Sequence, residues 1–87
     1  MKLKYQFVFQ PIGDIYMGVP VGDSAKQFHG MMQLNEVGYD IVSLMTEEIC
    51  REDIVEKILE MYDVDRETAE LYVNDVICYL EEQEVLF

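Results

Sequence analysis

The stretch MMQLNEVGYDIVSLM, residues 31–45, changes its hydrophobic period halfway along, and this change decides the fold. Its first part, MMQL, is uncharged and mostly apolar, which is typical of a short strand. Beyond the join, apolar residues recur at helical spacing, at Val37, Ile41, Leu44 and Met45. Asn35 stands at the join, where its side-chain oxygen can accept a hydrogen bond from a free amide of the first helical turn. We therefore expect a strand at 31–34 that leads directly into a helix capped by Asn35.

Two segments before this stretch alternate between apolar and polar residues, as half-buried strands do. LKYQFVFQ, residues 3–10, has one face made of Leu3, Tyr5, Phe7 and Phe9. IYMGVPV, residues 15–21, has one face made of Ile15, Met17, Val19 and Val21. Pro20 predicts fraying or a sheet edge, because proline donates no ladder hydrogen bond. PIGD at 11–14 indicates a turn, and residues 22–30 indicate a loop with room for one helical turn.

Two more helices are expected after the first, separated by the polar break YDVDRET at residues 62–68. One apolar face of the second is made of Ile54, Val55, Ile58, Leu59 and Tyr62. The third shows i, i+3, i+4 spacing at Ala69, Tyr72, Val73, Val76, Ile77 and Leu80. Asp65 can cap this helix. Gly38 in the first helix suggests either close approach of another backbone or chance, because glycine is a poor helix former. The final VLF is expected to pack on the core. The sequence thus predicts one α+β domain over residues 1–87, a three-stranded antiparallel meander followed by three helices in a winged helix-turn-helix-like order.

The formal net charge of −12 is concentrated in the helical half of the chain. Residues 1–34 carry three lysines and two aspartates, a net +1, whereas residues 35–87 carry sixteen acids and three basic residues, a net −13. Nucleic-acid affinity depends on Lys and Arg displacing counterions, so this charge disfavours DNA and RNA. The third helix also has a single arginine against seven acids or amides, whereas a DNA-recognition helix needs basic or amide side chains aimed at bases and phosphates. A partner that carries positive charge is favoured instead.

The remaining composition gives little support for catalysis. No apolar run approaches the roughly 18 residues of a membrane helix, and MKLKYQFVFQ is too interrupted for a signal peptide, so we expect a soluble, cytoplasmic protein. Cys50 and Cys78 fit neither a disulfide framework nor a zinc motif and are expected to be reduced structural thiols. His29 is the sole histidine, and Ser24 and Ser43 have no base near them in sequence. We therefore expect no catalytic activity, no metal and no cofactor.

The stretches LNEVGYDIVSLM and EDIVEKILEMYDVDRETAELYVNDVICYL together form a pattern that resembles the PqqD family of small winged-helix-like proteins, also called RiPP recognition elements. The resemblance covers about residues 30 to 87 and rests on Leu34, Asn35, Gly38, Ile41, Leu44, Ile54, Val55, Leu59, Tyr62, Val64, Val73, Ile77 and Leu80. Cys50 departs from a common Ser or Thr cap, and Glu84 departs from a common glycine. Both departures lie at helix ends, away from the surface that would bind a peptide.

The resemblance implies a non-catalytic peptide chaperone of natural product biosynthesis. Family members hold the leader segment of a ribosomally made precursor peptide and present it to a modifying enzyme, often a radical SAM enzyme. The leader adds as a strand to the third strand and lies against the third helix. The implied partners are therefore a precursor peptide and a modifying enzyme, while the pathway and the affinity stay open.

The residues of the third strand suit such a site. An outer strand has free amides and carbonyls that can template an added strand, and this one has neither charge nor proline: Gly30, Met31, Met32, Gln33 and Leu34. Methionines are flexible enough to adapt to a peptide. Equally, one of the two methionines can face the core while the other lies on ordinary surface.

A second stripe on the third helix, made of Leu71, Asp75, Cys78 and Glu82, is expected to form the opposite wall of the groove. A solvated face explains the same stripe equally well. Tyr72 and Tyr79 share another face and are expected at the edge of the core. The predicted peptide-binding side chains of this helix are therefore Leu71, Asp75 and Cys78. The alternative function is a general protein–protein adaptor, or a homodimer that uses the same edge strand in place of a monomer or weak dimer.

Overall fold

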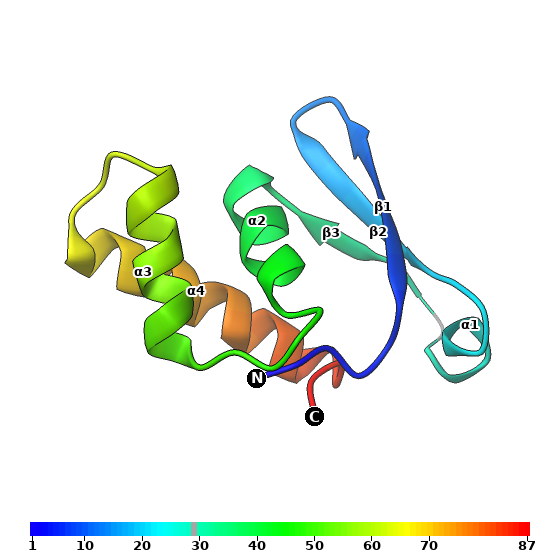
Figure 1. Cartoon of the computed structure of the whole chain (residues 1–87). Helices are drawn as coiled ribbons and strands as arrows, with labels where there is room; N and C mark the ends of the chain where they lie inside the picture. Colours follow the sequence, from blue (N-terminus) through cyan, green and yellow to red (C-terminus); the bar gives the residue numbers. More distant parts are fainter. Residues whose placement is uncertain (29) are drawn as a thin grey trace.

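The computed structural model of the chain describes residues 1–28 and 30–87, so His29 lies outside the described residues. The elements follow in the order β1 (Phe7–Ile12), β2 (Ile15–Pro20), α1 (Ser24–Gln27), β3 (Met32–Leu34), α2 (Glu36–Leu44), α3 (Arg51–Met61) and α4 (Arg66–Glu82). The sheet has the antiparallel strand order β1-β2-β3 and stands beside the layer formed by α2, α3 and α4 (Figure 1). The predicted α+β class and the order of strands and helices are confirmed, and α1 is the helical turn for which the loop had room.

The β1–β2 hairpin extends farther than the sequence predicted. Pro11 and Ile12, predicted as turn residues, pair with Tyr16 and Ile15, which leaves a two-residue connection. Gly13 begins that connection with φ of 62°, as the first central residue of a type II′ hairpin turn requires. At the other end, residues 3–6 precede β1, and Leu3 forms an isolated bridge with Leu86.

Pro20 does not place β2 at an edge, because β2 is the central strand. β3 pairs with β2 only as far as the Gly18–Met32 pair, so the missing N–H of Pro20 falls beyond the shorter neighbour. On the β1 side, Pro20 lies opposite Phe7 and ends the strand. A proline is tolerated here because no ladder bond is needed from its nitrogen.

The helix-facing side of the sheet is aromatic. Phe7 and Phe9 are half-buried while Val8 is exposed, as the alternation of β1 predicted. Gly18 of β2 is buried under the ring of Phe9, and a Cβ at Gly18 would lie 2.5 Å from that ring. Since strand residues alternate between faces, the aliphatic set of β2 points away from the helices, and Val19 is 40% exposed.

The hydrophobic core lies between the three longer helices and β3. Its buried members are Met32, Leu34, Ile41, Val42, Met45, Ile54, Val55, Ile58, Ala69, Val73, Leu80 and Val85. The chain end packs on this core through Val85, as predicted, although Phe87 is exposed. No helix within residues 1–28 and 30–87 is both long and apolar enough to cross a membrane.

Both predicted helix caps are present. Asn35 Oδ1 accepts a hydrogen bond from Gly38 N at 2.8 Å, and Asp65 Oδ1 accepts one from Thr68 N at 2.8 Å. Hydrogen bonding with Thr68 lowers the pKa of Asp65. A Cβ at Gly38 would lie 3.2 Å from Asn35 Oδ1 and 3.4 Å from side-chain atoms of Leu34. The close neighbours of Gly38 are thus side chains of its own cap and strand, and not another backbone.

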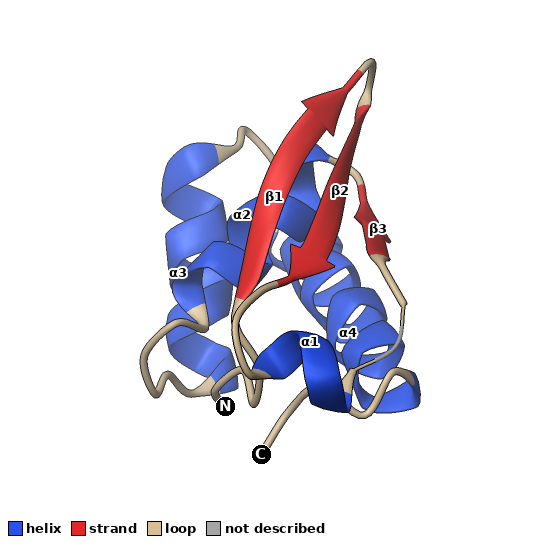
Figure 2. Ribbon diagram, turned by 90° about the vertical axis from the view of Figure 1, so that its right-hand side faces the viewer, coloured by secondary structure: helices blue, strands red, loops and turns tan. Residues whose placement is uncertain are grey.

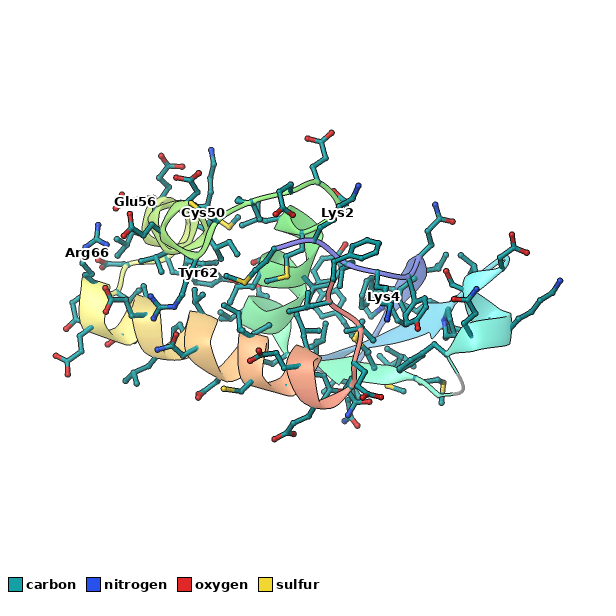
Figure 3. The ribbon with its side chains drawn as sticks, turned by 90° about the horizontal axis from the view of Figure 1, so that it is seen from below. Lys2, Lys4, Cys50, Glu56, Tyr62 and Arg66 are labelled. Atoms are coloured by element: carbon teal, nitrogen blue, oxygen red, sulfur yellow. The ribbon has the colours of Figure 1, made fainter. Side chains whose placement is uncertain are left out.

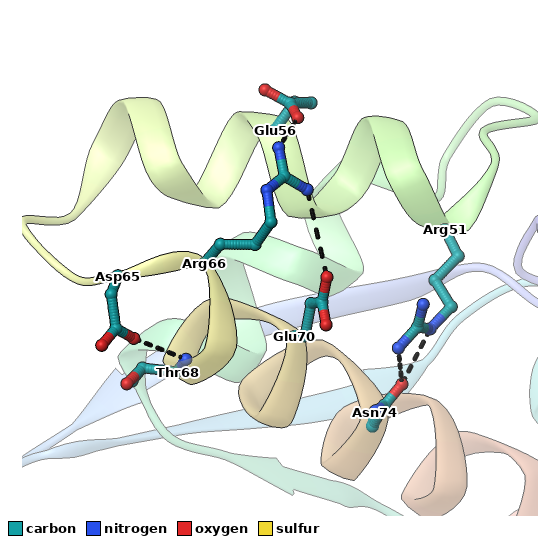
Figure 4. A network of polar contacts seen from close by, with 7 residues as sticks. All are labelled: Arg51, Glu56, Asp65, Arg66, Thr68, Glu70 and Asn74. Atoms are coloured by element: carbon teal, nitrogen blue, oxygen red, sulfur yellow. Dashed lines mark hydrogen bonds and ion pairs between the residues drawn. The ribbon is translucent and has the colours of Figure 1, made fainter.

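Polar contacts hold α3 against α4 (Figure 4). Arg66 pairs with Glu56 of α3 and, at 4.0 Å, with Glu70 of its own helix. Nearer the other end of the helix pair, Arg51 Nε donates to Asn74 Oδ1 at 2.7 Å. These contacts engage both arginines of the helical half within the molecule, while the buried residues Ala69, Val73 and Leu80 anchor α4 to the core.

Candidate peptide-binding site

β3 is one edge of the sheet, and α4 runs beside it (Figure 2). In an antiparallel ladder, successive residues point their backbone groups alternately toward and away from the neighbouring strand. The N–H of Gln33 donates to the hydroxyl of Tyr79 on α4 at 3.2 Å, so it points away from β2. Met32 and Leu34, on either side, therefore direct their backbone groups toward Gly18 and Tyr16 of β2. Within β3, Gln33 is the residue that offers both an N–H and a C=O to an added strand.

The two methionines before the join have different surroundings. Met32 has 0% exposure and belongs to the core, whereas Met31 is 59% exposed. Gly30 and Gln33 are also exposed, and Leu34 is buried. The side chains that this segment can offer to a ligand are consequently those of Met31 and Gln33, while Met32 and Leu34 hold the strand to the core.

Two small cavities of about 170 and 180 Å³ lie between α4 and the β3–α2 corner. The first is lined by Gln33, Leu34, Asn35, Gly38, Asp75, Val76 and Tyr79. The second is lined by Asn35, Val37, Tyr72, Asp75 and Val76. The structure therefore brings the predicted residue Asp75 together with Gln33 and Leu34 in one groove.

Leu71 and Cys78 lie farther round α4 and line neither of these cavities. Side chains advance by about 100° per residue around a helix, so Leu71 and Cys78 are turned away from the face that presents Tyr72 and Tyr79. Both are exposed, Leu71 by 56%. Their part in peptide binding stays a prediction for a ligand wide enough to reach round α4.

The sequence assigned only structural roles to several other residues of the groove: a helix cap for Asn35, apolar helix positions for Val37 and Val76, and the core edge for Tyr72 and Tyr79. The apolar spacing of α4 assigned Tyr72 and Val76 to the core stripe, and in the structure they line its border with the groove. Tyrosine is suited to such a border, since its ring packs on apolar groups while its hydroxyl reaches a polar partner. The available signal was that Tyr72 and Tyr79, seven residues apart, share one face of the helix.

The charge of the groove comes from one carboxylate. Asp75 is exposed and lines both small cavities, and the part of the chain that the structure describes gives it no ion pair. A bound segment would therefore meet backbone donors and acceptors, two tyrosine rings, aliphatic surface and a single negative charge. This set of groups suits recognition of an extended peptide with apolar side chains and a Lys or Arg.

Two comparisons with known proteins found matches to this chain. The sequence profile of the family described as coenzyme PQQ synthesis protein D (PqqD) matches residues 21–86, a range that contains β3 and all of α4. The chain therefore belongs to the PqqD family, as its sequence predicted. Among solved structures, it is similar to one described as TbiB1 in complex with the TbiA(beta) leader peptide, with a TM-score of 0.71 and 30% identity over 99% of this chain and 94% of that one. A comparison with curated proteins found no match.

Proposed function

We propose that the protein is a non-catalytic module that binds the leader of a ribosomally synthesised precursor peptide along β3 and presents it to a modifying enzyme. The observation that carries the proposal is the outward N–H of Gln33, at a sheet edge that is flanked by the groove of α4. Membership of the PqqD family and the likeness to a solved structure with a bound leader peptide support it. A radical SAM enzyme is the class of partner that the family resemblance favours.

In this proposal the leader adds as a fourth strand. Its backbone pairs with the N–H and C=O of Gln33, which requires the Tyr79 hydroxyl to give up its bond to the same N–H. Alternate side chains of the leader enter the two cavities beside Asp75, and the others lie near the exposed side chain of Met31. Backbone pairing supplies affinity for any extended peptide, and the cavities with their single carboxylate supply the selection. The groups present suit binding and orientation of a peptide.

The sharpest test changes the backbone donor and leaves the rest in place. Gln33→Pro removes the outward N–H, while the ladder to β2 survives because that N–H takes no part in it. Gln33→Ala is the matched control, because it removes the same side chain and keeps the N–H. Fluorescence anisotropy with labelled leader segments of precursor peptides from neighbouring reading frames should show binding weakened at least about tenfold by proline and by less than about threefold by alanine. Equal affinities of the two variants, with both folded by circular dichroism, would contradict strand addition at β3.

A further inference from the structure

A larger cavity, of about 550 Å³, lies at the β1 edge of the sheet, opposite the β3 edge. It lies between the N-terminal segment, β1 and α2, and its walls include the rings of Tyr5, Phe7, Phe9 and Tyr39. The rings of Phe9 and Tyr39 meet edge to face at a centroid distance of 5.4 Å, which joins the sheet side of the cavity to the helix side. A volume of this size falls within the range of ligand-binding clefts, which is roughly 300–1,000 Å³. We call this region the β1–α2 groove.

β1 is the second edge of the sheet, and part of its backbone is open beside this groove. Val21 N donates to Gln6 O at 3.1 Å, so Gln6 faces β2. By the alternation of an antiparallel ladder, Val8 also faces β2, while the N–H and C=O groups of Phe7 and Phe9 point outward. Both phenylalanines line the cavity with which this edge is continuous. An extended segment could therefore pair with β1 and place a side chain in the cavity.

The charge of the β1–α2 groove is opposite to that of the rest of the molecule. Lys2 and Lys4 line it, and none of its lining residues is acidic. Within residues 1–28 and 30–87, Lys26 pairs with Asp23 and Lys57 with Glu60, whereas Lys2 and Lys4 form no ion pair. Lys4 lies 5.8 Å from the centroid of the Tyr5 ring. Figure 3 shows the two lysines apart from Glu56 and Arg66 of the α3–α4 contact.

We propose that the β1–α2 groove binds an extended acidic segment of a protein partner, in which one or two carboxylates adjoin a bulky apolar side chain. The backbone of the segment would pair with Phe7 and Phe9, the apolar side chain would fill the aromatic cavity, and the carboxylates would contact Lys2 and Lys4. Lys4 also lines a neighbouring cavity with Glu81 and Glu84, which offset part of its attraction, whereas acids farther away than the Debye length of about 8 Å at physiological salt are largely screened. The occupant differs in charge from the ligand of β3, and the two edges can be occupied together.

The test uses two synthetic hexapeptides with blocked ends, Glu-Glu-Phe-Leu-Glu-Glu and Lys-Lys-Phe-Leu-Lys-Lys, titrated into the ¹⁵N-labelled full chain. The acidic peptide should shift the amide signals of Phe7 and Phe9 and leave that of Gln33 in place. The basic peptide should leave Phe7 and Phe9 unshifted. Shifts of Phe7 and Phe9 by both peptides alike, or by neither, would overturn the proposal.

Two double variants with the same change in net charge separate local contacts from overall charge. Lys2→Glu with Lys4→Glu should weaken binding of the acidic peptide at least about tenfold, because two attractive contacts become repulsive. Lys26→Glu with Lys57→Glu should change it by less than about twofold, because these lysines lie outside the groove and pair with other acids. Equal weakening by both pairs would overturn the proposal. Leader binding read at Gln33 is independent of either result, so failure at one edge is distinguishable from failure at the other.

Discussion

The two edges of the sheet differ in length, in neighbour and in charge. β3 spans Met32–Leu34, lies beside α4, and has its outward N–H held by the Tyr79 hydroxyl. β1 spans Phe7–Ile12 and opens, beside α2, onto a cavity with two lysines that form no ion pair with the residues the structure describes. Exposed sheet edges are templates for unwanted strand pairing, and a different feature restricts such pairing at each edge. β3 is short and occupied by a side chain, whereas Pro11 shortens the useful part of β1 because its nitrogen, which points outward, carries no hydrogen.

On the two proposals above, one small sheet binds two different peptides, one at each edge. Backbone pairing is the same at both edges and cannot distinguish peptides. Selection between basic and acidic peptides therefore depends on the side chains beside each edge, namely Asp75 at β3 and Lys2 with Lys4 at β1.

The largest effect is expected from the core methionine of β3. Met32→Ala should lower the free energy of unfolding by about 2–5 kcal/mol, because it leaves a cavity under the strand. Met31→Ala should change it by less than about 0.5 kcal/mol, since that side chain is exposed. Urea unfolding of both variants measures the difference. Similar losses for the two would mean that β3 is not anchored through Met32.

Tyr79→Phe should strengthen leader binding about two- to tenfold. The hydroxyl that the leader must displace from Gln33 is absent from this variant, and one hydrogen bond contributes about 0.5–1.5 kcal/mol. Tyr72→Phe is the matched control, because it removes a hydroxyl from the same groove without touching Gln33. Anisotropy titrations compare the two variants. A Tyr79→Phe variant that binds the leader more weakly would show that the hydroxyl helps to hold the peptide.

Asp75→Asn should weaken a leader that carries Lys or Arg about two- to fivefold at low salt, with little effect at high salt, because the pair is exposed and screened. Glu82→Gln removes a charge from the same helix at a position that lines neither cavity, and it should leave binding almost unchanged. The salt dependence of Kd separates them. If Kd changes with salt concentration equally in the two variants, the leader is selected by the general charge of α4 and not by Asp75.

The smallest effect is expected far from both edges, at the cap of α4. The pKa of Asp65 is lowered in the folded chain by hydrogen bonding with Thr68, so its carboxylate stabilises the fold above the unfolded pKa of about 4. That contribution is lost as the pH falls through the lowered folded pKa. The Asp65→Ala variant should therefore have a slightly lower Tm than the unchanged protein at pH 7, and this difference in Tm should disappear in strong acid. Binding at both edges should stay the same, and a loss at either would show that the cap positions the groove.

Much of the fold could be predicted because its signals are local. The change of period at Asn35, the caps at Asn35 and Asp65 and the alternation of Phe7 and Phe9 are each set by neighbours in the chain. The hairpin turn was placed too early because proline usually ends a strand, and only the pairing of Pro11 with Tyr16 shows that its nitrogen faces an open edge. Pro20 was taken as a sign of a sheet edge for a similar reason. The length of β3 decides whether β2 needs a backbone N–H at position 20, and β3 ends before it.

The site was less predictable because it depends on the angle at which α4 meets the sheet. The structure brings Asp75 together with Gln33 in one groove, whereas Leu71 and Cys78 lie farther round α4 and line neither small cavity. Periodicity identifies the core face of a helix, but it does not say on which flank the sheet ends. The β1–α2 groove had no sequence signal, because residues 2–9 meet α2 only in the folded chain.

The central claim is that the leader adds to β3, and a titration of the ¹⁵N-labelled chain with precursor leader peptides tests it most directly. Strand addition at β3 should shift the amide signals of Gln33 and of the α4 residues that line the two small cavities and leave those of Phe7 and Phe9 unchanged. The Gln33 amide should also become more protected from hydrogen exchange as its partner changes from Tyr79 to the peptide backbone. Shifts centred on Phe7 and Phe9, with Gln33 unmoved, would contradict strand addition at β3.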